Sequence, residues 1–250
     1  VSNIGLQLYS IKEISQKSFF GAIELTAASG YDGIEFAGFF DTPASELKKV
    51  LDSNGIAACG CHTGITALED EFNENVEYSL EIGNSAIIIP ALPEEMRSSR
   101  DAWLATADKM NSLNDRLKKY GIKLGYHNHA FEFEKFDGIY GYDIFAANTS
   151  PDILLEIDTY WVEYPGENVV GYVNKYKDRL ELLHLKDMGK DRDSTEIGSG
   201  ILDMPAIIKA AEKTEWFIVE QEHFSIPQPE SIKISCEYLK GLVKSKHWIL

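Results

Sequence analysis

The stretch LGYHNHAFEF, residues 124–133, places His127 and His129 two residues apart, after an apolar run that predicts a strand. The chain has only six histidines, and two of them stand at this one strand end. Residues two apart on a strand point to the same side. Because imidazole can ligate a metal or transfer a proton near neutral pH, this spacing predicts two groups that share one chemical site.

Polar residues end five further apolar runs. Three of these ends carry pairs with the same spacing of two, and two carry single residues: Glu156 and Asp158, His184 and Lys186, Glu220 and Glu222, Glu35, and His62. Buried charged groups are costly unless they are paired or bound to a metal, so carboxylates and imidazoles gathered from several strands predict a divalent cation. The donors are oxygen and nitrogen without thiolate, which is compatible with Mn²⁺, Mg²⁺, Co²⁺ or Zn²⁺.

The elements that must position these residues follow a regular alternation of short apolar runs and longer amphipathic stretches. The expected strands are 4–10, 33–38, 56–64, 85–91, 122–129, 152–158, 180–187 and 216–222. The expected helices lie near 15–29, 43–54, 68–82, 98–120, 140–148, 166–178, 203–214 and 229–245. Eight such units in 250 residues predict an α/β fold, a single (β/α)8 TIM barrel domain over residues 1–250.

The alternative fold is an open, doubly wound sheet. That fold would place a glycine-rich phosphate turn after the first strand, and the segment QLYSIKE has none. In a TIM barrel the active site lies at the carboxyl ends of the strands. The polar residues named above all follow their apolar runs at that end, so the barrel predicts that they share one mouth.

The composition of the chain limits the kinds of binding partner that we expect. The net charge of −16 repels phosphate backbones, so we expect no nucleic acid partner. The sequence has no run of 18 apolar residues, and we expect no membrane partner. The sequence leaves the oligomeric state open, with a homo-oligomer as one alternative. For the compartment, the cytoplasm is favoured, with the periplasm as the alternative if a signal peptide was removed before Val1.

Five segments together resemble one known superfamily: GYHNHAFEF, LLEIDTYWVEYPG, LLHLKDM, EIGSGILD and IVEQE. The chain resembles the xylose isomerase-like barrels, and within them the sugar phosphate isomerase/epimerase group, which includes inosose dehydratases and ketose 3-epimerases. The similarity extends from GLQLYS to IVEQE, which is nearly the whole chain. It implies a metal-dependent (β/α)8 barrel that acts on a small-molecule carbohydrate substrate.

The resemblance also implies a ligand set of Glu, Asp, His and Glu from the fifth to eighth strands. Three ligands match by motif: Asp158, His184 and Glu220. Dehydratase-like members carry a His-x-His followed slightly later by a Glu, which implies Glu132 as the fourth ligand. His127, which stands where the epimerases place a Glu, is the first alternative, and Glu134 is the second.

The chemistry that fits is removal of a proton α to a carbonyl, with a metal that stabilises the enediolate. The candidate catalytic residues are His129, His127, Lys186 and Glu220. The candidate substrate-binding residues are His62, Glu35, Trp161 and Glu222. Lys186 would hold a hydroxyl or a developing oxyanion, or it would instead form a salt bridge with Asp187 or Glu222.

The sequence therefore predicts a divalent-metal-dependent isomerase or epimerase acting on a sugar, polyol or keto-sugar. The alternative is a metal-dependent lyase on the same scaffold, either inosose dehydratase-like or keto-glycoside-eliminating, and His127 in place of a Glu favours it. An endonuclease IV-like phosphodiesterase is a remote alternative, which the acidic charge disfavours. A non-catalytic sugar-binding barrel is the last alternative. Arginine is sparse, so a phosphorylated substrate is not favoured over a neutral one.

Overall fold

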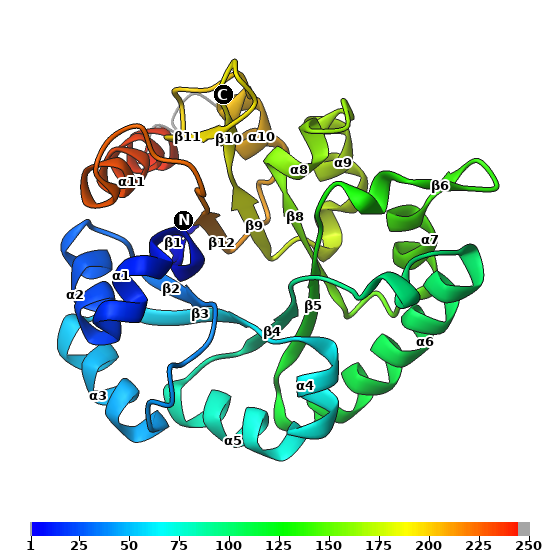
Figure 1. Ribbon diagram of the computed structural model, residues 1–250, viewed down its shortest axis with the longest axis horizontal. Helices are drawn as coiled ribbons and strands as arrows, with labels where there is room; N and C mark the ends of the chain where they lie inside the picture. The colour runs from blue at the N-terminus through cyan, green and yellow to red at the C-terminus, as the bar shows by residue number, and fades with distance from the viewer. Residues whose placement is uncertain (1, 245–250) are drawn as a thin grey trace.

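The computed structural model describes residues 2–244 and shows a closed barrel of eight parallel strands surrounded by helices (Figure 1). The barrel strands are β1 (Asn3–Gln7), β2 (Gly33–Phe36), β3 (Ala57–His62), β4 (Ala86–Ile89), β5 (Lys123–His127), β8 (Leu154–Asp158), β9 (Leu182–Leu185) and β12 (Trp216–Val219). They neighbour one another in chain order, and β12 closes the barrel by pairing with β1. The predicted TIM barrel is confirmed.

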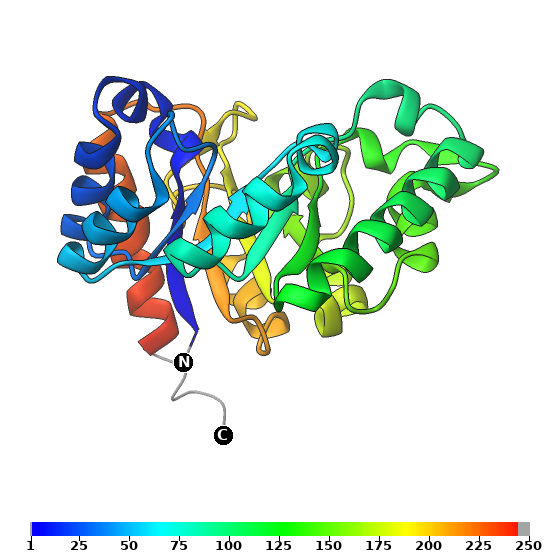
Figure 2. The ribbon, with the colours of Figure 1, turned by 90° about the horizontal axis from the view of Figure 1, so that it is seen from below.

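The helices form the outer layer of the molecule. They are α1 (Lys12–Lys17), α2 (Phe19–Ala28), α3 (Ala44–Asn54), α4 (Ile65–Asp70), α5 (Phe72–Ile82), α6 (Arg100–Leu117), α7 (Gly141–Asn148), α8 (Thr159–Glu163), α9 (Val169–Tyr176), α10 (Met204–Ala210) and α11 (Gln228–Lys244). Figure 2 shows that α11, the last described helix, lies beside α2. The Tyr31 hydroxyl, which follows α2, donates to the Ile232 carbonyl of α11 and joins the two.

Most predicted elements differ from the observed ones by a few residues at their ends, as the predicted strand 216–222 does, since β12 ends at Val219, and three differ more. The first strand ends at Gln7, because Leu8–Ile11 is a 3-10 helix. The predicted helix 15–29 is divided at Ser18, whose extended backbone and side chain cap the start of α2 by accepting from the Gly21 N–H. The predicted helix 68–82 is divided between α4 and α5. The predicted helix 229–245 is α11, and residue 245 lies outside the described residues.

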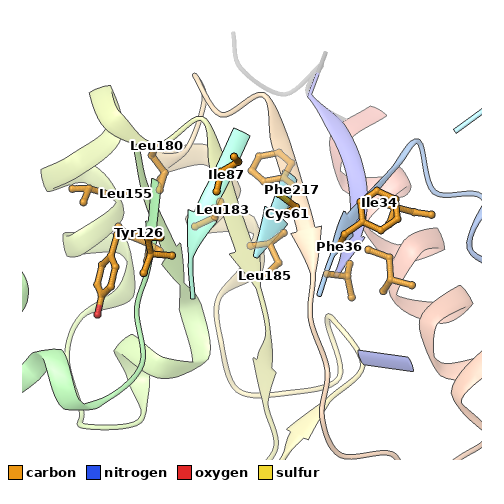
Figure 3. Close-up of a cluster of buried hydrophobic side chains, with 14 of the residues drawn as sticks. Ile34, Phe36, Cys61, Ile87, Tyr126, Leu155, Leu180, Leu183, Leu185 and Phe217 are labelled. Atoms are coloured by element: carbon orange, nitrogen blue, oxygen red, sulfur yellow. The ribbon is translucent and has the colours of Figure 1, made fainter. Parts of the chain in front are cut away.

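Side chains on the barrel strands alternate between an outer and an inner face. The outward side chains pack under the helices, and Figure 3 shows part of this layer, including Ile87, Leu155, Leu183 and Phe217. The inward side chains form a separate apolar layer, made of Cys59, Ala86, Ile88, Leu154, Leu182 and Ile218. This inner layer fills the amino-terminal part of the barrel interior and leaves the carboxyl-terminal part to polar residues.

Two small hairpins lie in the loops that follow the barrel strands. The first pairs β6 (Lys135–Phe136) with β7 (Ile139–Tyr140), and the second pairs β10 (Asp187–Met188) with β11 (Ser194–Thr195). The Asp187 carboxylate accepts hydrogen bonds from the backbone N–H groups of Gly198, Gly200 and Leu202, which fixes the loop after β11. Among the described residues, no helix is both long and apolar enough to cross a bilayer.

Candidate active site

Four buried side chains from four neighbouring strands meet at the carboxyl end of the barrel. We call them the mouth group: His127, Asp158, His184 and Glu220. Each stands two or four residues beyond an inward apolar position or glycine of its strand, so the period of two that builds the apolar layer also builds this group. One nitrogen or oxygen of each residue lies within 4.8 Å of those of the other three.

The distances between the nitrogen and oxygen atoms of the mouth group suit coordination of one shared metal ion. The Nε2 atom of His127 lies 3.5 Å from Asp158 Oδ2 and 3.9 Å from Glu220 Oε2, and His184 Nδ1 lies 2.9 Å from Glu220 Oε2. With zinc-to-ligand bonds of about 2.1 Å, two ligands are at most about 4 Å apart. Asp158 Oδ2, His184 Nδ1 and both His127 nitrogens are buried without a hydrogen-bond partner among the described residues. This donor set fits a divalent cation.

The electrostatics differ among the members of the mouth group. Burial opposes the charge on His184, but Glu156 and Glu35 overcome it and raise the pKa of His184 well above its usual value, so a cation at Nδ1 would displace a proton. Burial, together with the neighbouring His184, lowers the pKa of His127 well below its usual value, which favours the neutral imidazole that binds metals. Burial raises the pKa of Asp158 to about 6. Burial also opposes ionisation of Glu220, but Lys186 and His184 outweigh it and hold the pKa of Glu220 well below its usual range.

A second polar cluster lies beside the mouth group, on the Nε2 side of His184. We call it the inner group: Glu35, His62, Glu156 and the Nε2 edge of His184. Glu35 Oε2 lies 2.6 Å from His184 Nε2 and 3.1 Å from His62 Nε2, and Glu156 Oε2 lies 3.1 Å from the same His62 atom. Burial opposes the charge on His62, but Glu35 and Glu156 overcome it and raise the pKa of His62 to about 10.

His184 belongs to both groups, and its two nitrogens face in different directions. Because Nε2 contacts Glu35, the Nδ1 atom is left to face Glu220 in the mouth group. Gln7 Nε2 donates to the same Glu35 oxygen at 2.7 Å and fixes its position. A carboxylate behind a histidine orients the ring of a metal ligand and fixes its tautomer. The inner group therefore holds His184 in the orientation that the mouth group requires.

A cavity of about 480 Å³ opens above the mouth group. Its polar and aromatic lining residues include Tyr9, His62, His127, His129, Trp161 and Glu220. Glu222 lines it as well, and no lysine or arginine is among its described lining residues. The size is within the range of about 300–1,000 Å³ that is typical of small-molecule sites.

The structure brings most of the predicted catalytic residues to this cavity. The His129 ring lies 5.1 Å from that of His127 and 5.4 Å from that of Trp161. Burial, with His127 beside it, lowers the pKa of His129 to about 4, so the imidazole is neutral at physiological pH. Lys186 is buried outside the cavity lining and donates to Glu222 and, at 3.4 Å, to Glu220. Of the two predicted roles of Lys186, the contacts match the salt bridge with Glu222.

Two predicted roles do not match the geometry. Glu132, the predicted fourth ligand, is not brought into the mouth group, and His127 occupies that place. The Glu132 carboxylate instead accepts from the Tyr126 hydroxyl at 2.6 Å and from the His129 N–H at 2.9 Å, because the 3-10 turn after β5 directs it away from the cavity. Glu134, the second alternative ligand, is exposed.

Glu35 is the second residue whose predicted role does not match the geometry. It was expected to bind substrate, but it is fully buried, lies outside the cavity lining and contacts His184. Two supporting residues were not foreseen: Gln7, which holds Glu35, and Tyr126, which holds Glu132. Gln7 carries a signal in the sequence, since it is a polar residue at the end of the apolar run NIGLQ.

The model of the xylose isomerase-like TIM barrel family matches residues 23–242. The chain belongs to this family. An inosose dehydratase from Clostridium beijerinckii is 25% identical in an alignment that covers 83% of this chain and 83% of that protein. A structure named as a sugar phosphate isomerase/epimerase from Parabacteroides distasonis has a TM-score of 0.84 and 26% identity, covering 96% of this chain and 94% of that one.

A third relative shares the fold at lower identity. The structure of an IolI protein with a bound zinc atom has a TM-score of 0.79 and 16% identity, and it covers 99% of this chain and 100% of that chain. These family members are named as dehydratases, isomerases and epimerases, and the present chain is an enzyme.

Proposed function

We propose that this chain is a divalent-metal-dependent isomerase or epimerase that acts on a neutral keto-sugar or polyol ketone by moving the proton on the carbon next to the carbonyl. The observation that carries this proposal is the mouth group, whose unpaired, buried nitrogen and oxygen atoms lie below a cavity lined by a neutral histidine. The names of the relatives support a sugar or polyol substrate.

His127, Asp158, His184 and Glu220 would hold the cation through the atoms that face one another in the mouth group. When bound, the cation acts as a Lewis acid toward a carbonyl oxygen of the substrate. The zinc atom of the IolI structure is compatible with this donor set, and Mn²⁺, Mg²⁺ and Co²⁺ are the other candidates.

His129 is the base that this geometry favours. It lines the cavity, and its lowered pKa keeps it unprotonated. Glu220 is the second candidate, because it lines the same cavity and stays ionised beside Lys186. Trp161 lies against the His129 ring and limits the position of that ring from one side.

The cavity lining favours a neutral substrate over a phosphorylated one. A phosphate group is bound mainly by arginine, lysine or a helix N-terminus. The described lining contains two carboxylates, Glu220 and Glu222, and no cationic lysine or arginine. The same charges argue against a phosphodiester of DNA as the substrate.

A lyase is the second candidate function, and one observation favours it. Epimerisation needs proton donors and acceptors on both faces of the substrate, whereas elimination needs one base and a leaving hydroxyl. Of the two carboxylates in the mouth group, only Glu220 is among the described residues that line the cavity. The curated inosose dehydratase relative agrees with a dehydration.

The test is NMR product analysis in D₂O with metal-loaded protein and a panel of neutral ketoses and inososes. An isomer with deuterium at the α carbon supports an isomerase or epimerase. An unsaturated product contradicts that function and supports the lyase instead. Asp158→Asn should abolish either product, whereas the exposed Asp152→Asn should retain it. A panel that shows neither deuterium exchange nor product contradicts the proposal.

A further inference from the structure

His129 and His184 differ in how their rings are oriented. The His184 ring contacts the Glu35 carboxylate through Nε2, and this contact fixes the ring. In the His129 ring, by contrast, the Nδ1 atom is buried without a hydrogen-bond partner among the described residues. Packing, rather than a hydrogen bond at Nδ1, must therefore keep this edge of the ring buried and decide how the ring faces the cavity.

Three aromatic rings pack beside the His129 ring. Phe131 is nearly parallel to it, with 12° between the ring planes and 5.5 Å between the centroids. The Trp161 ring lies at 5.4 Å and 44°, and the His127 ring lies at 5.1 Å and 74°. Because aromatic pairs prefer offset-stacked or edge-to-face arrangements, these contacts favour one orientation of the imidazole.

The Phe131 ring is in turn held by Arg97, which comes from the loop after β4. The Arg97 guanidinium carbon lies 3.9 Å from the centroid of the Phe131 ring, a cation–π contact. Arg97 Nε donates to the Leu92 carbonyl at 3.1 Å, and the Arg97 N–H donates to the Glu94 carbonyl at 3.0 Å. The guanidinium is therefore fixed to its own loop and ties Phe131 to it.

We infer that Phe131 and Arg97 are positioning residues for the base: Phe131 orients the His129 ring toward the substrate, and Arg97 holds Phe131. This inference rests on the proposed function, because it assigns the proton transfer to His129. Neither Phe131 nor Arg97 is among the described residues that line the cavity. Their removal should therefore lower kcat with little change in KM, since no contact with the bound substrate is lost.

The backbone of His129 is held by a separate contact. The Glu132 carboxylate accepts from the His129 N–H at 2.9 Å and from the Tyr126 hydroxyl at 2.6 Å. These bonds fix the 3-10 turn that carries Phe131 and do not involve the Phe131 side chain. A change of that side chain should therefore alter the orientation of the His129 ring and leave the turn in place.

The first experiment measures kcat and KM of metal-loaded protein in D₂O, with the ketose or inosose that the wild type converts fastest. Phe131→Leu keeps an apolar side chain but removes the ring. We expect kcat to fall about tenfold because the base is misaligned, with KM within about twofold of wild type. Phe131→Tyr keeps the ring and should recover most of the lost kcat.

Arg97→Gln tests the second positioning residue. It removes the cation but leaves the Phe131 ring, and we expect kcat to fall about threefold, again with KM nearly constant. Arg116→Gln is the matched control, because Arg116 on α6 lies 3.7 Å from the centroid of the Phe72 ring on α5. It removes the same kind of contact from the helical layer, so kcat should not change.

A second experiment reads the ring directly, without turnover. The histidine rings of ¹³C-labelled, Zn²⁺-loaded protein are observed by NMR, and a His129→Gln variant assigns the His129 signals. The stacked Phe131 ring shifts the His129 ring protons upfield. Arg97→Gln retains Phe131 but loosens it, so these signals should move toward those of an unstacked histidine, whereas Arg116→Gln should leave them in place.

The outcomes separate the two proposals. The positioning role is overturned, and the proposed function stands, if Phe131→Leu keeps kcat within twofold of wild type or if Phe131→Tyr loses as much. Unchanged His129 signals in Arg97→Gln overturn the part assigned to Arg97, and this variant also decides the case if Phe131→Leu does not fold. If the wild type converts no substrate, the proposed function fails and the inference fails with it.

Discussion

The mouth group and the inner group contain the same kinds of residue in adjoining layers of one barrel, yet their side chains are paired differently. In the inner group, Glu35 and Glu156 face the Nε2 atom of His62, and Glu35 also faces His184. In the mouth group, the His127 and His184 rings meet edge to face with their centroids 4.6 Å apart, and His127 has no hydrogen-bond partner among the described residues.

This difference shows how pairing decides what a buried polar cluster can do. Where carboxylates neutralise imidazolium groups directly, the cluster is largely self-compensated and serves as a support. Where a carboxylate and a neutral imidazole, here Asp158 and His127, leave lone pairs unpaired, the cluster can bind a cation. We therefore expect a divalent cation in the mouth group and none in the inner group.

The largest expected effect comes from breaking the mouth group. Asp158→Asn replaces a ligand carboxylate by a neutral amide of the same size, so metal affinity and stabilisation of developing charge should both fall. We expect kcat/KM to drop about 10²–10³-fold or more, measured with saturating Mn²⁺ or Zn²⁺. Asp152→Asn, on the exposed loop before β8, is the matched control. Activity within threefold of wild type in Asp158→Asn would remove this residue from the site.

The next effect comes from breaking the inner group. His62→Ala removes one of the two imidazoles that face the buried Glu35 and Glu156 carboxylates and leaves only His184 beside them. Removing one partner of a buried ion pair costs about 3–5 kcal/mol of the free energy of unfolding, which urea denaturation of metal-free protein would measure. The exposed His223→Ala should change it by less than about 0.5 kcal/mol. A similarly small change in His62→Ala would mean that the inner group is not held by these ion pairs.

A third effect concerns Glu132, a carboxylate that belongs to neither group. Burial raises the pKa of Glu132 from 4.5 to about 7, so the folded protein keeps this proton after the unfolded chain has lost it. The contribution of Glu132 to stability is therefore greatest at low pH and falls as the pH rises from 4.5 to 7, by about 3 kcal/mol in total.

The measurement for Glu132 is the difference in unfolding free energy between wild type and Glu132→Gln at several pH values. The variant should gain stability relative to wild type as the pH rises from 5 to 8. Glu134→Gln, at an exposed neighbour, should show a constant difference. A constant difference for Glu132→Gln as well would show that this carboxyl is ionised throughout, as a metal ligand would be.

The smallest expected effect comes from the link between the two groups. Glu35→Gln keeps the shape but weakens the contact that orients His184. Loss of such a supporting carboxylate typically lowers metal affinity about 10–100-fold, which titration calorimetry with Zn²⁺ would measure. The histidine ¹⁵N spectrum should also show a changed tautomer balance for His184. Unaltered affinity and tautomer would mean that packing alone orients the ring.

The sequence was enough to predict the barrel and the strand ends that carry chemistry. Leu154, Glu156 and Asp158 alternate along β8 with a period of two, and this period is visible in the sequence. The depth of each residue in the barrel was not visible. Glu35 and Glu220 both follow apolar runs, but only the stagger between neighbouring strands places Glu35 below the cavity and Glu220 in its wall.

The fourth ligand shows a second limit of sequence reasoning. Whether Glu132 or His127 joins the mouth group depends on how the chain turns after β5. That turn is fixed by the Tyr126 hydroxyl, which faces outward and binds Glu132 away from the cavity. The link between the loops after β9 and β12 has the same origin, since Ser194 Oγ accepts from the N–H groups of Glu222 and His223, which are 28 and 29 residues away in the chain. Contacts of this kind leave no periodic pattern.

The most direct test of the difference between the two groups is a crystal structure of Mn²⁺-loaded protein with an anomalous difference map. We predict one strong peak, bonded to His127, Asp158, His184 Nδ1 and Glu220, with no peak among Glu35, His62 and Glu156. A peak in the inner group, or a coordination sphere that includes Glu132 in place of His127, would contradict the account.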